Sequence, residues 1–545
     1  MEWSPCFCFL RSRLHSCMSV SVQPPVEPAR ESAALPAESA LYRWIFPLLG
    51  VLSLLASCVL WSLKKQQWAD EVFTRVELGD PSFAHLLRSV PHLGGAGMPL
   101  FYLTGWPWAH IFGLSDLSLR LYSSAGVCAA FLVIFLALRR RLGARPAFLG
   151  AAFGFFAHLM VLSQNAEARD YGLYLFLTAL AVSELLRIAE IAQPRPRDLL
   201  RFGLSQAGMV LGHVLALIFA FPLLLALVVA DLSLQRRRWK VWLSGVAGWA
   251  ALLPWIPAIR ASMAVGKPHG WIALPHLTDL FLSFSGWLFA ALYVPFGHGH
   301  PLVLLTGWAA ALLCIVAIAI TGIHGLRTEP HLRALYLAGF VLLLSPIAIF
   351  TVSWIVAPIW VGRYMLPTAI GIAILAAAWA RYATQRLRGS LAAAVAVLLL
   401  LLPPASALAA HPQFVNVTRI DRVLSTPAAA GRPLVCDSIR DFLVVERYST
   451  HPASIEFPLD WQAALHGPPI AVGGYHLMVN YRRAGYLAPN IVDGSALLRR
   501  HSFLVLDNSA TNWFRLVIQS NPRFTWRVLA QIDPSRRILL VTAKP

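Results

Sequence analysis

About eleven long apolar segments constrain the fold of this chain more than any other feature of its sequence. Most are long enough to cross a hydrocarbon core of ~30 Å as helices, which rise about 1.5 Å per residue. We therefore expect a polytopic α-helical membrane protein of about eleven spans. The segments are 42–63, 119–138, 146–163, 170–192, 200–215, 216–234, 239–258, 301–322, 334–353, 364–383 and 389–407.

The charge of the chain is strongly basic and is placed unevenly. Its 45 Lys and Arg residues against 26 Asp and Glu residues give a net charge of +19, although only 13% of the residues are charged and 57% are apolar. In a soluble protein this excess would point to nucleic acid. Here the basic clusters at 139–145, 195–201 and 236–240 occupy alternate loops, as cytoplasmic loops do. We therefore expect no nucleic-acid partner, and a multi-pass protein of the inner (cytoplasmic) membrane with its N-terminus in the cytoplasm.

After the last apolar segment, short β-like runs alternate with helical stretches, which predicts a small extracytoplasmic α/β domain. No Gly-rich phosphate-binding motif follows these runs, so no nucleotide is expected. Strands are predicted at 433–436, 454–457, 503–506 and 537–541, and helices at 438–449 and 512–519. The expected organisation is a flexible cytoplasmic tail (1–40), a membrane domain (41–410, with a first external loop at 64–118) and the α/β domain (411–545).

The apolar segment 277–297 is expected to lie at the membrane interface or to re-enter the membrane rather than to span it. A span there would place the basic loops at 327–333 and 381–388 outside, against the positive-inside rule. Its Asp279, Trp287 and Pro295 suit an interfacial or re-entrant segment.

Two adjacent acids, Asp70 and Glu71, follow the first apolar segment and are the strongest local signal. Most such pairs are simply solvated loop charges. Here Trp68 and Phe73 flank the pair, and Lys65 precedes it, where it can hold an anionic headgroup or a phosphate. A partly dehydrated carboxylate is more basic and suits the removal of a proton from a hydroxyl. Both acids are therefore candidates for catalysis.

A second group of charges lies in the short external loop between the third and fourth segments. It consists of Glu167, Arg169 and Asp170, followed by Tyr171. Charges this close to hydrocarbon require partners or a function. They can satisfy one another in a structural ion pair, and the same network can also position a base.

A third group, Arg363 and Tyr364, stands at the external end of a segment. A lone interfacial arginine often snorkels to the headgroups, whereas its guanidinium fork also suits a lipid phosphate. His213 lies near another external end and is interpreted first as a buried, hydrogen-bonded histidine and second as a substrate contact. His298 and His300 lack a third metal ligand.

In this order and on this topology, these motifs resemble the GT-C membrane glycosyltransferases. The resemblance is to the bacterial Rgt-like, dolichyl-phosphate-mannose-protein mannosyltransferase-like branch of the protein O-mannosyltransferase and aminoarabinose-transferase superfamily, and it covers roughly 42–407. The family's His-Pro is replaced here by Gly97-Met98, so no histidine role is carried over there. The motifs are Asp70-Glu71, the stretches 99–102 and 112–120, the loop 167–171 and Arg363-Tyr364.

The resemblance implies inverting transfer of a sugar from a polyprenyl-phosphate donor, lying among membrane lipids, to an acceptor hydroxyl at the outer face. The acceptor would be a glycan such as lipopolysaccharide, a lipid or a protein. The implied catalytic residues are Asp70 as the base, Glu71 and Glu167; the implied donor phosphate-binding residues are Arg363, Tyr364 and Arg169. Weaker substrate contacts are Lys65, Tyr102, Asp170, Tyr171 and His213. Some relatives use a divalent metal near the acid pair, which the sequence leaves open.

Three alternatives compete with this interpretation, and one of them is an inactive, structural relative of these enzymes. A transporter or lipid flippase is expected to show internal repeats and charged or broken helices near the midplane, whereas the acids here gather at one external surface. An O-antigen polymerase or ligase relies on a large external loop late in the chain, whereas the acid pair lies early.

Overall fold

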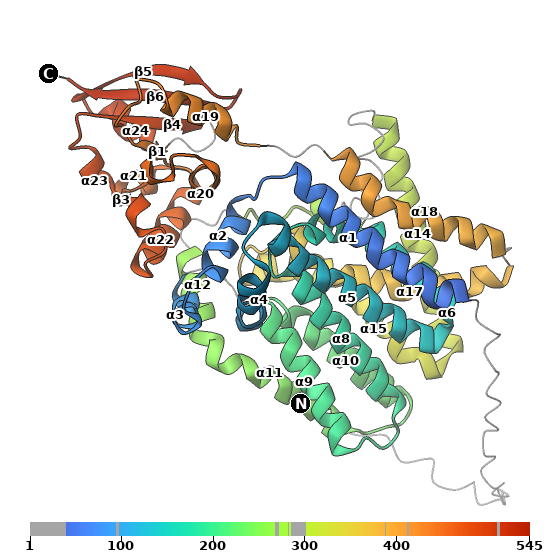
Figure 1. Cartoon of the computed structure of the whole chain (residues 1–545). Coiled ribbons are helices and arrows are strands. Elements are labelled where there is room, and N and C mark those ends of the chain that lie inside the picture. The colour runs from blue at the N-terminus through green and yellow to red at the C-terminus, as the bar shows by residue number, and fades with distance from the viewer. Residues whose placement is uncertain are drawn as a thin grey trace, which may run out of the picture. The chain divides into compact units, whose positions relative to one another are not determined.

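The structure is a computed structural model that describes residues 40–93, 98–266, 272–281, 283–284, 301–386, 389–410, 414–508 and 513–544. A helical part is followed by a C-terminal domain built on a six-stranded sheet (Figure 1). Both belong to one packed unit, Glu38–Pro545. The expected tail before residue 40, the segment 277–297 beyond residue 284, and His298 and His300 lie outside the described residues.

The helical part consists mainly of α-helices with short π and 3-10 turns. The α-helices are α1 (Phe46–Lys64), α2 (Ala69–Leu78), α3 (Phe83–Ser89), α4 (Pro99–Phe112), α5 (Asp116–Leu142), α6 (Ala144–Phe156), α7 (Leu159–Asn165), α8 (Tyr171–Glu190), α9 (Pro196–Gly212), α10 (Leu217–Ser233), α11 (Trp239–Trp249), α12 (Ile256–Gly266), α14 (Pro301–Thr328), α15 (Arg333–Leu343), α16 (Ser345–Ile355), α17 (Thr368–Arg386) and α18 (Gly389–Ala409). The turns are η1 (Leu41–Ile45), η2 (Val90–His92), η3 (Ala250–Trp255), η4 (Pro330–Leu332) and η5 (Gly362–Met365).

Several of these helices are long and apolar enough to cross a membrane. Among the described residues there are 6 such helices, or up to 8 if each of two bent pairs counts as one span. The helices α10 and α17 contain shorter apolar stretches, Leu217–Ser233 and Thr368–Thr384. A multi-pass membrane protein is thus confirmed, while the number of about eleven spans stays a prediction.

One predicted span, 146–163, is not a single straight helix. It is divided into α6 and α7, which are bent by 73° at residues 157–158. At the break, the buried side chain of His158 places Nε2 3.2 Å from Oγ1 of Thr368, which begins α17. The bend directs the chain after α7 into the loop that carries Glu167 and Arg169.

Helices α5 and α8 pack with almost no side-chain space between their backbones. A Cβ on Gly126 would come within 2.4 Å of the backbone of Gly172, and one on Gly172 within 2.0 Å of the backbone of Ser123. Such close approach through small residues is a common way to pack membrane helices. It brings the start of α5, with Arg120, next to the start of α8, with Tyr171.

The C-terminal domain has the sheet order β3-β2-β1-β4-β6-β5. The first four strands are parallel, and β6 is antiparallel to both β4 and β5. Its strands are β1 (Leu434–Cys436), β2 (Ile455–Leu459), β3 (Ile491–Asp493), β4 (Ser502–Asn508), β5 (Phe524–Gln531) and β6 (Arg536–Ala543). Its helices are α19 (Val417–Leu424), α20 (Ile439–Tyr448), α21 (Trp461–His466), α22 (Pro469–Arg483), α23 (Gly494–Leu497) and α24 (Trp513–Ser520), with 3-10 turns η6 (Pro452–Ser454) and η7 (Ala488–Asn490).

The prediction of a small α/β domain is confirmed. The four predicted strands correspond to β1, β2, β4 and β6, and the two predicted helices to α20 and α24. The strands β3 and β5 and the helices α19, α21, α22 and α23 were not predicted.

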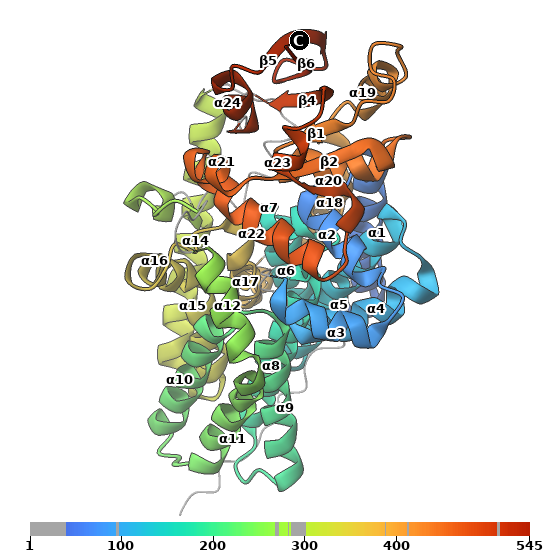
Figure 2. The same ribbon diagram turned by 90° about the vertical axis from the view of Figure 1, so that its left-hand side faces the viewer.

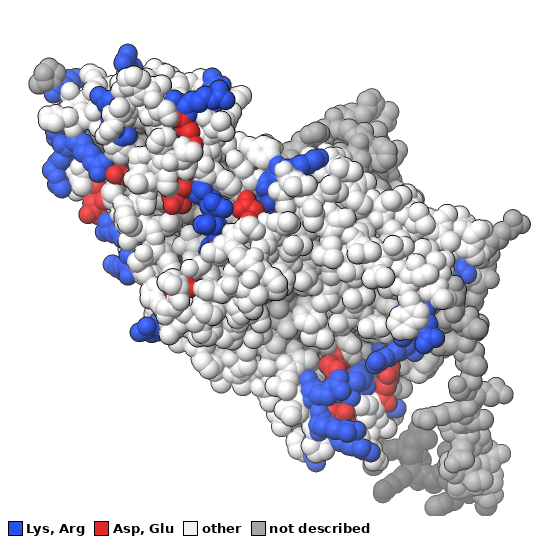
Figure 3. Space-filling view, viewed as in Figure 1, with Lys and Arg blue, Asp and Glu red and all other residues white. Residues whose placement is uncertain are grey.

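Charged side chains avoid much of the visible surface of the helical part. Figure 3 shows a wide area without Lys, Arg, Asp or Glu over these helices, with charges over the C-terminal domain and around the loop between α8 and α9. This distribution suits a segment of the molecule that faces hydrocarbon.

Candidate active site around Asp70 and Arg363

The acid pair lies in the first turn of α2. Trp68 precedes the helix in an extended conformation, and Glu71 reaches back so that Oε2 accepts the Trp68 backbone N–H at 3.2 Å. A glutamate at this third helical position satisfies a backbone donor that would otherwise lack a partner. The local sequence therefore fixes the start of the helix and with it the direction of both acids.

Glu71 is fully buried and already saturated with donors. Arg120 forms a double hydrogen bond with it, from Nε to Oε1 at 2.8 Å and from Nη2 to Oε2 at 2.9 Å. The backbone N–H of Ala168 donates at 2.9 Å, and the Lys65 ammonium lies 3.8 Å away. Burial alone raises the pKa of Glu71, but the charges of Lys65 and Arg120 and these hydrogen bonds lower it below its ordinary value. Glu71 is thus an anion at neutral pH that is buried away from solvent, which argues against its predicted part in the chemistry.

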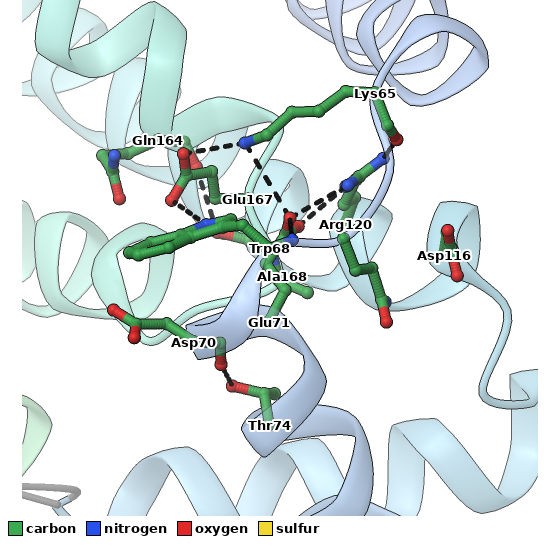
Figure 4. Close-up of polar contacts among 12 residues, drawn as sticks. Lys65, Trp68, Asp70, Glu71, Thr74, Asp116, Arg120, Gln164, Glu167 and Ala168 are labelled. Atoms are coloured by element: carbon green, nitrogen blue, oxygen red, sulfur yellow. Dashed lines mark hydrogen bonds and ion pairs between the residues drawn. The ribbon is translucent and has the colours of Figure 1, made fainter. Parts of the chain in front are cut away.

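Asp70 is directed differently, because adjacent helical residues project about 100° apart. Its side chain is 28% exposed, and Oδ2 lies 3.4 Å from Nη2 of Arg363. Figure 4 shows its carboxylate pointing away from the cluster around Glu71. Of the two acids, only Asp70 is placed to meet a substrate.

Arg363, in η5, is enclosed by aromatic rings. Its Nε donates to the Tyr171 hydroxyl at 2.8 Å. Its guanidinium carbon lies 5.4 Å from the ring centre of Trp68 and 5.8 Å from those of Tyr171 and Tyr364. Only 19% of the side chain is exposed. A snorkelling arginine keeps its head in water, so this enclosure argues against snorkelling. The guanidinium faces Asp70, and its predicted grip on a lipid phosphate stays a prediction.

The loop 167–171 does not form the internal ion pair considered above. Glu167 instead accepts from the Lys65 ammonium at 2.9 Å and from the Trp68 indole N–H at 3.1 Å (Figure 4). Arg169 donates from Nη1 to the backbone carbonyl of Asp70 at 3.1 Å and to Oγ1 of Thr74 at 3.3 Å. Glu167 therefore holds the Trp68 ring that covers Arg363, and Arg169 holds the turn that carries Asp70.

The weaker candidates separate into two groups. Asp170 is buried immediately before α8. The ring of His213 stacks on that of Tyr174, with 4.5 Å between the ring centres, and its centre lies 5.7 Å from those of Tyr171 and Tyr364. His213 therefore packs against Tyr171 and Tyr364, two of the aromatic residues that surround Arg363. Tyr102 is elsewhere: its buried hydroxyl donates to Oε2 of Glu77 at 2.8 Å, near the other end of α2. In the structure Tyr102 has a structural hydrogen bond, and its predicted contact with substrate stays a prediction.

Two residues of the site were not assigned from the sequence. Arg120 is fully buried against Glu71, and Trp68 joins Glu167 to Arg363. An arginine at the edge of an apolar segment was the available signal for Arg120, because such a charge needs a partner. Its partner, Glu71, could not be predicted, because the two residues are 49 positions apart and meet only in the folded protein.

The acid pair does not suit a divalent cation. Glu71 already receives four hydrogen bonds, and Asp70 faces a cationic guanidinium. Among the described residues, no group of three or more His, Cys, Asp or Glu side chains gathers as a metal site.

No protein-family model matches the chain, and no curated protein matches it. Solved structures do. ArnT from Cupriavidus metallidurans bound to undecaprenyl phosphate is 15% identical, with a TM-score of 0.52, over 92% of this chain and 98% of that chain. Apo ArnT (13% identity, TM-score 0.44, the same coverage) and the Archaeoglobus fulgidus oligosaccharyltransferase with Zn and sulfate (13%, 0.43, 84% of this chain and 68% of that chain) are more distant.

The likeness to ArnT confirms the architecture expected from the sequence motifs. The chain has a GT-C-type fold, with membrane helices followed by a small C-terminal sheet domain. At this level of identity the likeness concerns the fold alone.

Proposed function

We propose that the protein is an integral membrane glycosyltransferase that moves a sugar from a polyprenyl-phosphate donor to an acceptor hydroxyl at the outer face of the cytoplasmic membrane. The observation that carries this proposal is the pair of opposite charges formed by Asp70 and Arg363, 3.4 Å apart and both partly exposed. The fold of ArnT, whose structure holds undecaprenyl phosphate, supports a lipid-phosphate donor.

The two charges suit the two ends of one displacement. The acceptor oxygen attacks the anomeric carbon and gives its proton to Asp70, while the bond from that carbon to the phosphate oxygen breaks. The electron pair of that bond leaves with the polyprenyl phosphate. The fork of Arg363 neutralises the charge that develops there, and the rings around it exclude water and strengthen this interaction.

The resting ion pair also has a role in this scheme. At rest, Oδ2 of Asp70 is in contact with the guanidinium of Arg363. A donor phosphate that takes the place of Asp70 on Arg363 releases the carboxylate as it binds. Glu71, Glu167, Lys65 and Arg169 fix the surroundings through the hydrogen bonds described above, so Asp70 is the group free to change partners.

The test is a transfer assay on purified full-length protein in lipid vesicles with a panel of radiolabelled polyprenyl-phosphate sugars and a cell-envelope acceptor fraction. We expect one labelled sugar to become acceptor-bound, with release of an equal amount of polyprenyl phosphate. Movement of intact labelled lipid across the vesicle membrane without cleavage would instead identify a transporter and refute the proposed reaction.

A further inference from the structure

Helix α2 belongs to two parts of the molecule at once. Its first turn carries Asp70, which faces the membrane helices, but its apolar side packs into the C-terminal domain. Ala69, Val72 and Phe73 are buried in the same hydrophobic cluster as the strands of the sheet. The Phe73 ring lies 4.7 Å from the ring of Tyr481 in α22.

Buried hydrogen bonds fix the far end of α2 to α22. Glu77 is buried, and its Oε1 accepts from the Tyr481 hydroxyl while Oε2 accepts from Tyr102. Asp80, just beyond the helix, accepts from the hydroxyl of Tyr486 at 2.5 Å. Figure 2 shows α22 between the strands of the sheet and the helix α3 of the first loop. A buried carboxyl group held by hydroxyl donors is costly to disturb, because losing a donor leaves a desolvated acceptor without a partner.

The near end of α2 is fixed by the C-terminal domain as well. The hydroxyl of Tyr448, the last residue of α20, accepts the backbone N–H of Gln67 at 2.8 Å and donates to Asp116. Gln67 stands three residues before Asp70. The C-terminal domain therefore holds the chain on both sides of the acid turn.

From these contacts we infer that the C-terminal domain positions Asp70 by clamping α2, with Tyr481 and Tyr448 as the positioning residues at its two ends. Arg169 holds the same helix from the membrane side, through the carbonyl of Asp70. A catalytic base is effective only within a narrow geometry, and small misplacements lower the rate steeply. The inference rests on the proposed function, and it makes the sheet domain a part of the active site rather than a separate cap.

The experiment compares full-length wild type with Tyr481→Phe and Tyr448→Phe in lipid nanodiscs. Phenylalanine keeps the ring and removes only the O–H. The matched control is Tyr475→Phe, because Tyr475 lies on the same α22 but contacts Trp461 and His476. Transfer kinetics are normalised to folded protein, and hydrogen exchange of the peptide 69–78 is measured on the same samples.

We expect kcat to fall about tenfold in Tyr481→Phe, because a buried acceptor of Glu77 is left without its donor. The KM for the lipid donor should stay unchanged because Arg363 is not touched. Exchange in 69–78 should rise in Tyr481→Phe and Tyr448→Phe and stay at the wild-type level in Tyr475→Phe. If Tyr481 and Tyr448 only stabilised the fold, their substitution would lower the yield of folded protein without changing kcat.

Two results overturn the inference: a kcat for both variants equal to that of the control, or faster exchange in α2 with an unchanged kcat. A wild type that transfers no sugar contradicts the proposed function by itself. In that case the exchange rates still decide whether the C-terminal domain orders α2.

Discussion

The cluster around Glu71 and the C-terminal sheet around Asp437 bury acids to nearly the same depth and treat them in opposite ways. Glu71 is 0% exposed and Asp437 3%. Glu71 sits among Arg120, Lys65 and two backbone donors, and its pKa is lowered. For Asp437, burial raises the pKa to about 8; Oδ2 accepts from the backbone of Phe514, and Oδ1 has no hydrogen-bond partner among the described residues.

The two acids differ because cationic side chains lie beside Glu71, whereas other carboxylates lie beside Asp437. Beside the acid turn, Glu71 is matched by Arg120 and Lys65 and Glu167 by Lys65, whereas Asp70 remains 28% exposed beside Arg363. In the sheet, Asp437 lies beside Asp441 and Asp507, whose charges help to keep it protonated. We therefore expect changes near α2 to alter catalysis and stability strongly, and changes at Asp437 to alter only the pH response of the domain.

The largest effect is expected from Asp70→Asn. Asparagine keeps the size of the side chain but does not accept the proton, so kcat should fall roughly 10²- to 10⁴-fold. The transfer assay measures this loss, with Glu190→Gln as the control, since Glu190 pairs with Arg141 at the other end of α8. Near-normal transfer by Asp70→Asn would remove Asp70 from the role of base.

The next effect is on stability, from Glu71→Gln. Removing one member of a buried ion pair leaves Arg120 desolvated and costs about 3–5 kcal/mol. Because the pKa of Glu71 is lowered in the folded protein, its contribution is present above the ordinary glutamate pKa and is lost as the pH falls. Thermal unfolding in detergent should show a large loss at neutral pH that shrinks in acid. An equal loss for Glu190→Gln, whose carboxylate is 53% exposed, would contradict the special place of Glu71.

A smaller effect is expected from Arg363→Lys. Lysine keeps the charge but loses the planar fork and the stacking on Trp68, so the KM for the lipid donor should rise about tenfold. Arg381→Lys serves as the control, because Arg381 pairs with Glu329 at the other end of α17. An unchanged donor KM in Arg363→Lys would argue against a bidentate grip on the phosphate.

The smallest effect on sugar transfer is expected from Asp437→Asn, which should alter only the pH dependence of the stability of the C-terminal domain. A folded-state pKa raised to about 8 means that the stability contribution of Asp437 is present in acid and is lost as the pH rises through that value. Wild type should therefore lose about 2 kcal/mol between pH 6 and pH 8 relative to the variant. Hydrogen exchange of β4 measures this difference, and parallel pH profiles for the two proteins would count against a protonated Asp437.

Local sequence predicted the parts of this molecule that depend on local chemistry. The apolar segments and the strands β1, β2, β4 and β6 follow from composition and periodicity. The strand β3 has three residues, and β5 is mostly exposed, with Trp526 and Val528 on the surface. The strand β3 is too short to show the alternation of a half-buried strand, whereas β5 does alternate over Phe524, Trp526 and Val528 and was missed despite this signal.

The candidate site follows the same rule. Asp70, Glu167, Arg169 and Arg363 were predicted because charges beside hydrocarbon need a reason. Their division of work was not predictable, since it depends on pairing over long distances. Glu71 meets Arg120 across 49 positions and Glu77 meets Tyr481 across 404, and no local pattern encodes such contacts.

The most direct test of the central claim is the affinity of undecaprenyl phosphate for wild type, Asp70→Asn and Arg363→Ala, measured in detergent at fixed pH and salt. If the donor phosphate replaces Asp70 on Arg363, Asp70→Asn should bind this lipid about 3- to 10-fold more tightly than wild type while failing to transfer sugar. Arg363→Ala should bind it more weakly. Weaker binding by Asp70→Asn, or unchanged binding by Arg363→Ala, would contradict the division of labour between the base and the phosphate fork.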